Sequence, residues 1–440
     1  MDPNELRGWG PAIDRALGWF GGGCAWVRNR VVGTREARWQ RVVVSQPIAN
    51  PDVFEGRADD LNRLTDSSEN RNIVWITGPP GIGKTALAGK FVRDRGLADS
   101  ARSFELSADS KLQDLLESVN SFLLDRQCVS LDEELKRPGL TPTQRIAALF
   151  RCLERTHFVL AIESYEEVAA DEDIAELLQQ AHERLAGAKI IVTSQSAPGW
   201  PIEERRVHLM GLQPEESRRV LAELGVTDGW REIHDAVDGS PKGLRVAAGL
   251  AKTYGVDAAI EAAGNGDDPE LGLYGEVYAR VTEPARRMWV MLTMLPGPFD
   301  RKTVLDLWGD GNGAFAWAQL ADCSVLDPRG DQWQMHALAR STAGKDRAGQ
   351  RGWQKQYGRK LVRYYTDFAV SKRDDGDAIE AELENMLAVA RLAYEYRKWK
   401  ALWRMGYALD ETLSRAGAWT VRQELLSLCY EAAGGKPRGK

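Results

Sequence analysis

The stretch GPPGIGKT, residues 78–85, decides how the rest of this sequence is interpreted. It has the spacing G-x-x-x-x-G-K-[S/T], it follows an expected strand at residues 72–77, and it opens an expected helix at residues 84–94. Glycines let backbone N–H groups converge on a phosphate, and the positive end of the helix adds to the attraction. Lys84 is expected to reach the β- and γ-phosphates, and the Thr85 hydroxyl to bind Mg²⁺. The motif therefore predicts a site for ADP or ATP, lined by Gly78, Pro79, Gly81, Ile82, Gly83, Lys84, Thr85 and Ala86.

Short apolar runs alternate with amphipathic segments on both sides of this loop, which is typical of a parallel α/β sheet. The expected strands cover residues 72–77, 103–106, 158–163, 189–193 and 206–209. The helices expected between them include residues 84–94, 112–124 and 171–185. The pattern therefore predicts an α/β P-loop NTPase domain.

Helices dominate after residue 212, for example at residues 216–224 and 230–237, with a loop expected at residues 264–268. The stretch SVLDPRGDQWQMH, residues 324–336, has two alternating apolar runs around a turn and predicts a β-hairpin. Helices packed on such a hairpin form a winged helix, and the paired helices beyond it are typical of the start of an α-solenoid. The expected units are an N-terminal segment (1–45), the nucleotide domain (46–212), a helical lid (213–268), a winged helix (269–348), a helical arm (349–433) and a basic tail (434–440).

The net charge, the cysteine content and the length of the apolar runs argue against several classes of protein. The formal net charge of −6 gives no support for binding to nucleic acid or to an anionic membrane. Five scattered cysteines argue against a disulfide framework or a zinc site and favour a reducing cytoplasm. The sequence contains no run of 18 uncharged apolar residues, so no membrane span is predicted. The N-terminal segment is either a short effector element or an arm packed on the nucleotide domain.

Three further motifs stand in a fixed order around the loop. VFEGRADDLNRL (residues 53–64) precedes the first strand, DGSPKGLRVAAG (238–249) lies in the expected lid, and QMHALAR (334–340) ends the expected hairpin. In this order they resemble the FxGRxxEL, GxP and MHD motifs of the signal-transducing ATPases with numerous domains (STAND), which include the NB-ARC proteins. The segment ELENMLAVARLAYEYRKW (382–399) resembles the opening helix of their C-terminal superhelix. The likeness extends from residue 53 to about residue 433.

The resemblance implies roles for four residues outside the phosphate loop. Val53 and Arg57 would contact the base or the sugar of the nucleotide. Pro241 would pack on the adenine side of ADP, and His336 would reach its β-phosphate and lock a closed form. As a lone histidine, His336 would more often be an ordinary packed or exposed residue, but the other motifs in register favour the ligand role.

Two strand ends depart from the STAND pattern, and both departures affect hydrolysis. The family usually ends the third strand with Asp followed by Asp or Asn, whereas FVLAIESYEEV (158–168) places Glu163 and Ser164 there. Glu163 keeps a carboxylate for Mg²⁺, longer by about 1.5 Å, but a serine cannot act as general base. Glu166 either orients water or is a solvated acid at a helix start. Gln195 replaces the arginine that senses the γ-phosphate in the family, and it brings no charge.

The sequence therefore favours a nucleotide switch that self-associates when activated, in prokaryotic defence or regulation, over two alternatives. A hydrolysing AAA+ remodeller would need an arginine finger, for which Arg151, Arg155 and Arg184 are available. A winged-helix transcription regulator would need a basic face, but residues 271–345 carry eight acidic and eight basic side chains, so DNA is not an expected partner. An effector or sensor protein is a further expected partner.

Overall fold

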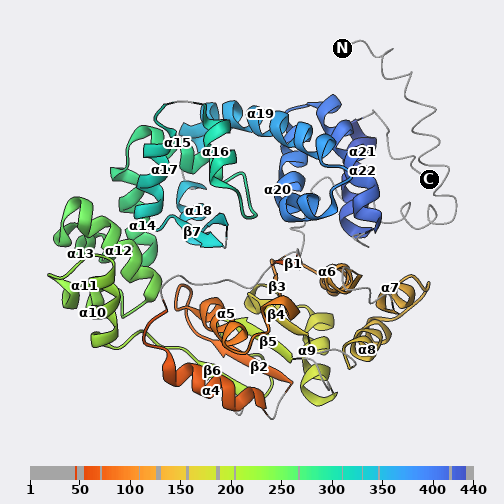
Figure 1. Cartoon of the computed structure of the whole chain (residues 1–440), viewed down its shortest axis with the longest axis horizontal. Coiled ribbons are helices and arrows are strands. Elements are labelled where there is room, and N and C mark those ends of the chain that lie inside the picture. The colour runs from red at the N-terminus through yellow and green to blue at the C-terminus, as the bar shows by residue number, and fades with distance from the viewer. Residues whose placement is uncertain are drawn as a thin grey trace.

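The computed structural model of the chain contains one α/β body and a long helical body that arches over it (Figure 1). Residues 1–44, Val53 and the tail after residue 432, for which the sequence makes predictions, lie outside the described residues. The structure describes residues 45–46, 54–69, 72–108, 110–124, 130–154, 158–184, 189–202, 205–265, 268–309, 311–329, 331–344, 347–415 and 419–432.

The sheet of the α/β body confirms the five predicted strands, with ends that differ by a few residues. Its strand order is β1-β3-β4-β5-β2-β6, and all pairs are parallel except β1 with β3. The strand that leads into the phosphate loop, β2, is therefore separated from the acid-bearing strand β4 by β5. The bounds are β1 (Ser45–Gln46), β2 (Ile73–Thr77), β3 (Ala101–Glu105), β4 (Val159–Glu163), β5 (Lys189–Ser194) and β6 (Arg206–His208).

Helices cover both faces of this sheet, because its strands are apolar on both sides. On β2, Val74 and Ile76 enter one core with α4 and α5, whereas Ile73 and Trp75 enter the other with α6, α8 and α9. The helix bounds are α4 (Ala58–Glu69), α5 (Lys84–Asp94), α6 (Leu112–Leu124), α7 (Ser130–Leu135), α8 (Pro142–Leu153) and α9 (Glu172–Arg184), with short 3₁₀ turns η1 (Ala98–Ser100) and η2 (Tyr165–Val168).

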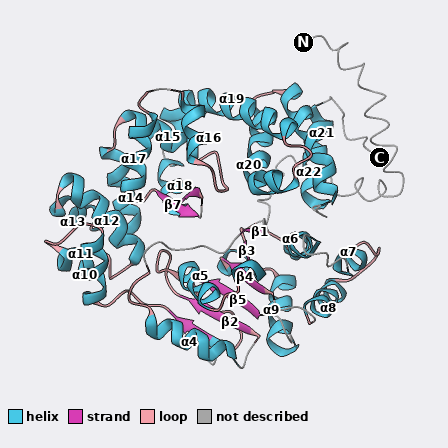
Figure 2. Cartoon of the chain, in the orientation of Figure 1, coloured by secondary structure: helices cyan, strands magenta, loops and turns pink. Residues whose placement is uncertain are grey.

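The helical body is built around a continuous apolar core that extends from Leu212 to Cys429. Figure 2 shows that, in the part of the chain that is described, the strands of this body lie in the small hairpin near the centre of the view. The helices are α10 (Pro214–Glu223), α11 (Trp230–Ala236), α12 (Pro241–Tyr254), α13 (Val256–Ala263), α14 (Pro269–Arg280), α15 (Glu283–Leu292), α16 (Arg301–Trp308), α17 (Gly313–Asp322), α18 (Ala337–Gly344), α19 (Arg347–Ser371), α20 (Gly376–Glu395), α21 (Trp399–Arg415) and α22 (Trp419–Ala432).

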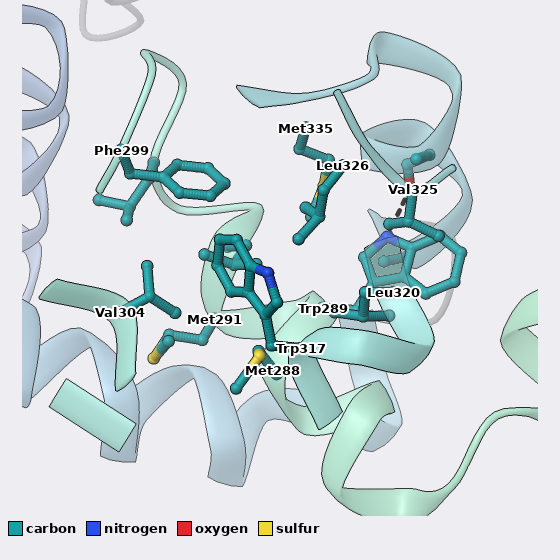
Figure 3. Packing of buried hydrophobic residues seen from close by; sticks show 14 of the residues in the cluster. Met288, Trp289, Met291, Phe299, Val304, Trp317, Leu320, Val325, Leu326 and Met335 are labelled. Atoms are coloured by element: carbon teal, nitrogen blue, oxygen red, sulfur yellow. Dashed lines mark hydrogen bonds between the residues drawn. The ribbon is translucent and has the colours of Figure 1, made fainter. Parts of the chain in front are cut away.

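The predicted hairpin forms in the helical body. Strands β7 (Leu326–Arg329) and β8 (Gln332–Met335) pair antiparallel, and Leu326 lies opposite Met335. Figure 3 shows these two residues facing Trp289 and Trp317 of the adjacent helices. The indole N–H of Trp289 donates to the Ala339 carbonyl oxygen at 2.9 Å, so this buried polar group is satisfied. The hairpin is therefore fixed by packing against α15 and α17. None of the helices in the described ranges could cross a membrane.

Candidate nucleotide site

The loop between β2 and α5 has the geometry of an anion cradle. Gly78 has φ 150°, and a β-carbon there would lie 2.7 Å from the Leu209 carbonyl oxygen, so the loop passes β6 too closely for a side chain. Gly83 precedes α5 in the left-handed region, with φ 99°. These glycines let the backbone turn its N–H groups toward the space above the N-terminus of α5, where a phosphate group binds favourably.

Lys84 lies at the start of α5 and bridges the loop. Its Nζ donates to the carbonyl oxygens of Gly78 at 2.8 Å and Pro79 at 2.9 Å. Burial lowers the pKa of the Lys84 ammonium, while nearby carboxylates, Glu166 foremost, raise it. A cation therefore lies inside the cradle, held by neutral carbonyl groups that phosphate oxygens can replace.

Thr85 and Glu163 meet across the sheet edge, although they are far apart in the sequence. The Thr85 hydroxyl donates to Glu163 Oε2 at 2.5 Å, and Ser103 Oγ, on β3, donates to Oε1. The Glu163 side chain is 8% exposed, so both carboxylate oxygens are held inside the site. A hydroxyl and a carboxylate are the hard oxygen ligands that Mg²⁺ takes in such sites, with water and phosphate completing its octahedron. The arrangement fits the predicted metal-binding roles of Thr85 and Glu163.

Glu166 is half-buried in the turn that follows β4. Ser164 adopts the left-handed conformation with φ 61°, and Tyr165 then packs into the core, where its ring meets that of Trp75 with centroids 5.2 Å apart. This turn directs Glu166 to β5, where its Oε2 accepts the backbone N–H of Gln195 at 3.1 Å. Both interpretations of Glu166, as a group that orients water and as a solvated acid, stay predictions. The Gln195 side chain is exposed at the same sheet edge.

Arg57 braces the phosphate loop from the outside. Its guanidinium donates to the Ile82 carbonyl oxygen at 2.9 Å and to Asp60 at 3.0 Å, and the side chain is only 7% exposed. The FEGR stretch thus lies beside the loop, with Arg57 bonded to loop backbone. The contact of Arg57 with the base or the sugar stays a prediction. The predicted contact of Val53 lies outside the described residues.

Pro241 is placed at the junction between the α/β body and the lid. It is the first residue of α12, and Ser240 caps that helix through the Gly243 N–H. The Ser240 hydroxyl also donates to Glu270 Oε1 from α14. Through this bond the GxP-like motif is linked to a carboxylate that reaches the phosphate loop.

His336 belongs to a second buried cluster, between the lid and the hairpin. Its ring stacks on Tyr274 with centroids 6.0 Å apart, and its Nδ1 is buried without a hydrogen bond. Lys242 Nζ donates to Asp327 Oδ1 at 2.6 Å and to the Ser324 carbonyl oxygen at 2.9 Å beside it. Burial, with Lys242 nearby, lowers the pKa of the His336 imidazole to about 3, so the ring is neutral. The structure brings the loop, Glu163, Glu166 and Gln195 together, and it places His336 against the ring of Tyr274 on α14. The contact of His336 with a β-phosphate stays a prediction.

Comparisons with known proteins bear on the fold. No family model and no curated protein matches the sequence. A STAND protein with a tetratricopeptide-repeat sensor from Pyrococcus horikoshii matches in structure, with a TM-score of 0.54 and 16% identity over 90% of this chain. The chain has a STAND-like P-loop NTPase fold. It spans 60% of the length of that solved chain.

Two other solved structures are similar to parts of this STAND-like chain. A Walker-type ATPase of Pyrococcus abyssi matches 68% of this chain and 98% of its own, with 13% identity and a TM-score of 0.38. Cdc6p of Pyrobaculum aerophilum matches 69% of this chain and 98% of its own, with 11% identity and a TM-score of 0.34. The fold assignment rests on the Pyrococcus horikoshii structure.

Sequence reasoning missed three polar residues of this STAND-like fold. Ser103 was expected only as a strand residue, and its bond to Glu163 depends on β3 and β4 being neighbours in register. Lys242 directly follows the proline of the GxP-like motif, and its partner Asp327 lies 85 residues away in the sequence. Glu270 follows the expected loop at residues 264–268, and no local pattern indicates its contact with the phosphate loop.

Proposed function

We propose that this chain is a nucleotide-dependent molecular switch of the STAND type, closed with ADP and opened by exchange for ATP with Mg²⁺. The observation that carries the proposal is the Thr85–Glu163 pair beside Lys84, because these three groups supply the metal-facing and phosphate-facing contacts of a nucleotide site. Bound Mg²⁺ would neutralise charge on the β- and γ-phosphates. The lid reaches this site, since Ser240 contacts Glu270 and Glu270 lies against the loop.

Weak hydrolysis follows from the residues at the sheet edge. Ser164 offers no general base, and Gln195 offers no positive charge for the transferring phosphoryl group. The loss of one charged donor at this position typically costs several orders of magnitude in rate. Slow hydrolysis suits a switch, because the closed and the open form then persist long enough for partner proteins to bind one of them.

Activation, in this proposal, ends in self-association. Nucleotide exchange would free the surfaces that the helical body covers in the closed form, and the exposed nucleotide domains would then associate, with an effector or sensor protein as a further partner. Prokaryotic defence or regulation in the cytoplasm is the setting that fits best. The buried free thiols of Cys152, Cys323 and Cys429 suit such a reducing compartment.

A hydrolysing ATPase of the AAA+ kind is the second candidate, and one observation favours it. Glu166 faces Lys84 and holds the Gln195 backbone N–H, which is a suitable position for orienting an attacking water. Of the arginine-finger candidates, Arg151 is paired with Glu134 at 2.6 Å, and Arg155 and the side chain of Arg184 lie outside the described part.

The two candidates are separated by nucleotide content and turnover. Purified protein is denatured, the released nucleotide is identified, and ATP hydrolysis is measured beside Lys84→Ala and Glu166→Gln. A switch retains about one ADP per chain and turns over negligibly, whereas Lys84→Ala is empty. Rapid hydrolysis that both substitutions abolish would replace the switch by the remodelling ATPase.

A further inference from the structure

A carboxylate of the chain itself lies against the phosphate loop. Glu270, in the first turn of α14, is placed so that a β-carbon built on Gly81 would be 2.2 Å from its Oε1 and 2.7 Å from its Cδ. Gly81 has φ 70°, a conformation that glycine adopts readily. Because Gly81 has no side chain, the Glu270 carboxylate can contact the loop backbone directly. This contact joins the helical body to the loop that is proposed to bind phosphate.

Only one of the two carboxylate oxygens of Glu270 has a hydrogen-bond partner. Ser240 Oγ donates to Oε1, whereas Oε2 is buried without a hydrogen bond. The residue is 7% exposed, and its carboxylate interacts electrostatically with Lys84. Burial raises the pKa of Glu270, which the Ser240 hydrogen bond and the charges of Lys242 and Lys84 partly oppose. A buried carboxylate oxygen without a hydrogen bond, such as Glu270 Oε2, lowers the free energy of unfolding. The contact between Glu270 and the phosphate loop is therefore kept at a cost in stability.

Resting on the proposed function, we infer that Glu270 competes with the nucleotide phosphates for the cradle and thereby sets nucleotide affinity. Both groups are anions, both are attracted to Lys84, and two anions within a few ångströms of each other cannot share a buried site without a penalty. Nucleotide entry therefore moves the first turn of α14 away from Gly81. Since α14 packs on α12, α13 and α18, this movement links nucleotide binding to the lid and the hairpin.

The test is a binding titration with a fluorescent ADP derivative and Mg²⁺. Glu270→Gln keeps the size of the side chain and removes its charge, and it is compared with the wild type and with Lys84→Ala. The matched control is Glu276→Gln, which removes one negative charge from the same helix, where Glu276 is paired with Arg280 on the surface. Melting temperatures establish that each variant is folded, and Glu270→Ala provides a second removal of the charge.

The inference predicts that Glu270→Gln and Glu270→Ala lower Kd about tenfold, as expected for the loss of one close like-charge contact, while Glu276→Gln does not. Unchanged or weaker binding in both Glu270 variants, with normal binding by the wild type, would overturn the inference and leave the proposed function standing. If neither the wild type nor any variant binds, the proposed function fails and the inference fails with it.

Discussion

His336 gives the most quantitative test of the helical body. Burial and the charge of Lys242 lower the pKa of its imidazole to about 3, from 6.5 in an unfolded chain. Above pH 6.5 the His336 ring is mostly neutral in both the folded and the unfolded chain, so it hardly changes the free energy of unfolding. As the pH falls below 6.5, His336 binds a proton in the unfolded chain but stays neutral in the folded chain. The free energy of unfolding therefore decreases progressively down to about pH 3.

The size of this effect follows from linkage. At pH 5, which is about 1.5 pH units below the unfolded value, His336 lowers the free energy of unfolding by about 2 kcal/mol relative to pH 7. Glutamine fills a similar volume and does not titrate. The variant His336→Gln should therefore lose about 2 kcal/mol less than the wild type between pH 7 and pH 5, whatever its stability at pH 7.

Urea unfolding of nucleotide-free protein at the two pH values, followed by circular dichroism, measures this difference. His208→Gln is the control, because His208 is exposed on β6 and its loss removes the same number of histidines. The reasoning about His336 is refuted if His336→Gln and the wild type lose the same stability on acidification, or if His208→Gln reproduces the effect.

Three further substitutions test other contacts. Lys242→Met leaves the half-buried Asp327 without its cation and should lower the free energy of unfolding by about 1–2 kcal/mol, while adding Asp327→Asn should recover part of that loss, measured by urea unfolding. Trp289→Phe leaves the Ala339 carbonyl without its donor and should cost about 1–3 kcal/mol in the same assay; a neutral result would contradict the packing in Figure 3. Ser103→Ala should weaken Mg²⁺-dependent nucleotide binding but not Mg²⁺-independent binding, and Ser103→Thr should restore it; equal losses in both conditions would refute a role through Glu163.

The fold was predictable from the sequence because its signals are local. Strand β2 is a continuous apolar run, the loop after it has fixed glycine spacing, and the hairpin around residue 330 alternates with period two. Helix ends were less predictable: α10 begins at Pro214, two residues earlier than expected, because Gln213 and Glu216 form a capping box. Each of these elements is specified within a few residues of sequence.

The candidate site was predictable only in part, because much of it depends on contacts between distant segments. Lys84 and Thr85 are identified by their motif, and Glu163 by the end of its strand. Glu166 could not be assigned, since its direction depends on the left-handed turn at Ser164 and on the packing of Tyr165. Glu270 could not be found at all, because its contact with the loop arises from how the helical body lies on the α/β body.

The most direct test of the central claim is isothermal titration of Mg²⁺·ADP into nucleotide-free protein and into Lys84→Ala. We expect one site per chain in the wild type, with binding lost or weakened by at least about a hundredfold when the Lys84 ammonium is removed, since that charge lies inside the cradle. No binding by the folded wild type, or equal binding by both proteins, would contradict the assignment of residues 78–86 as a nucleotide site.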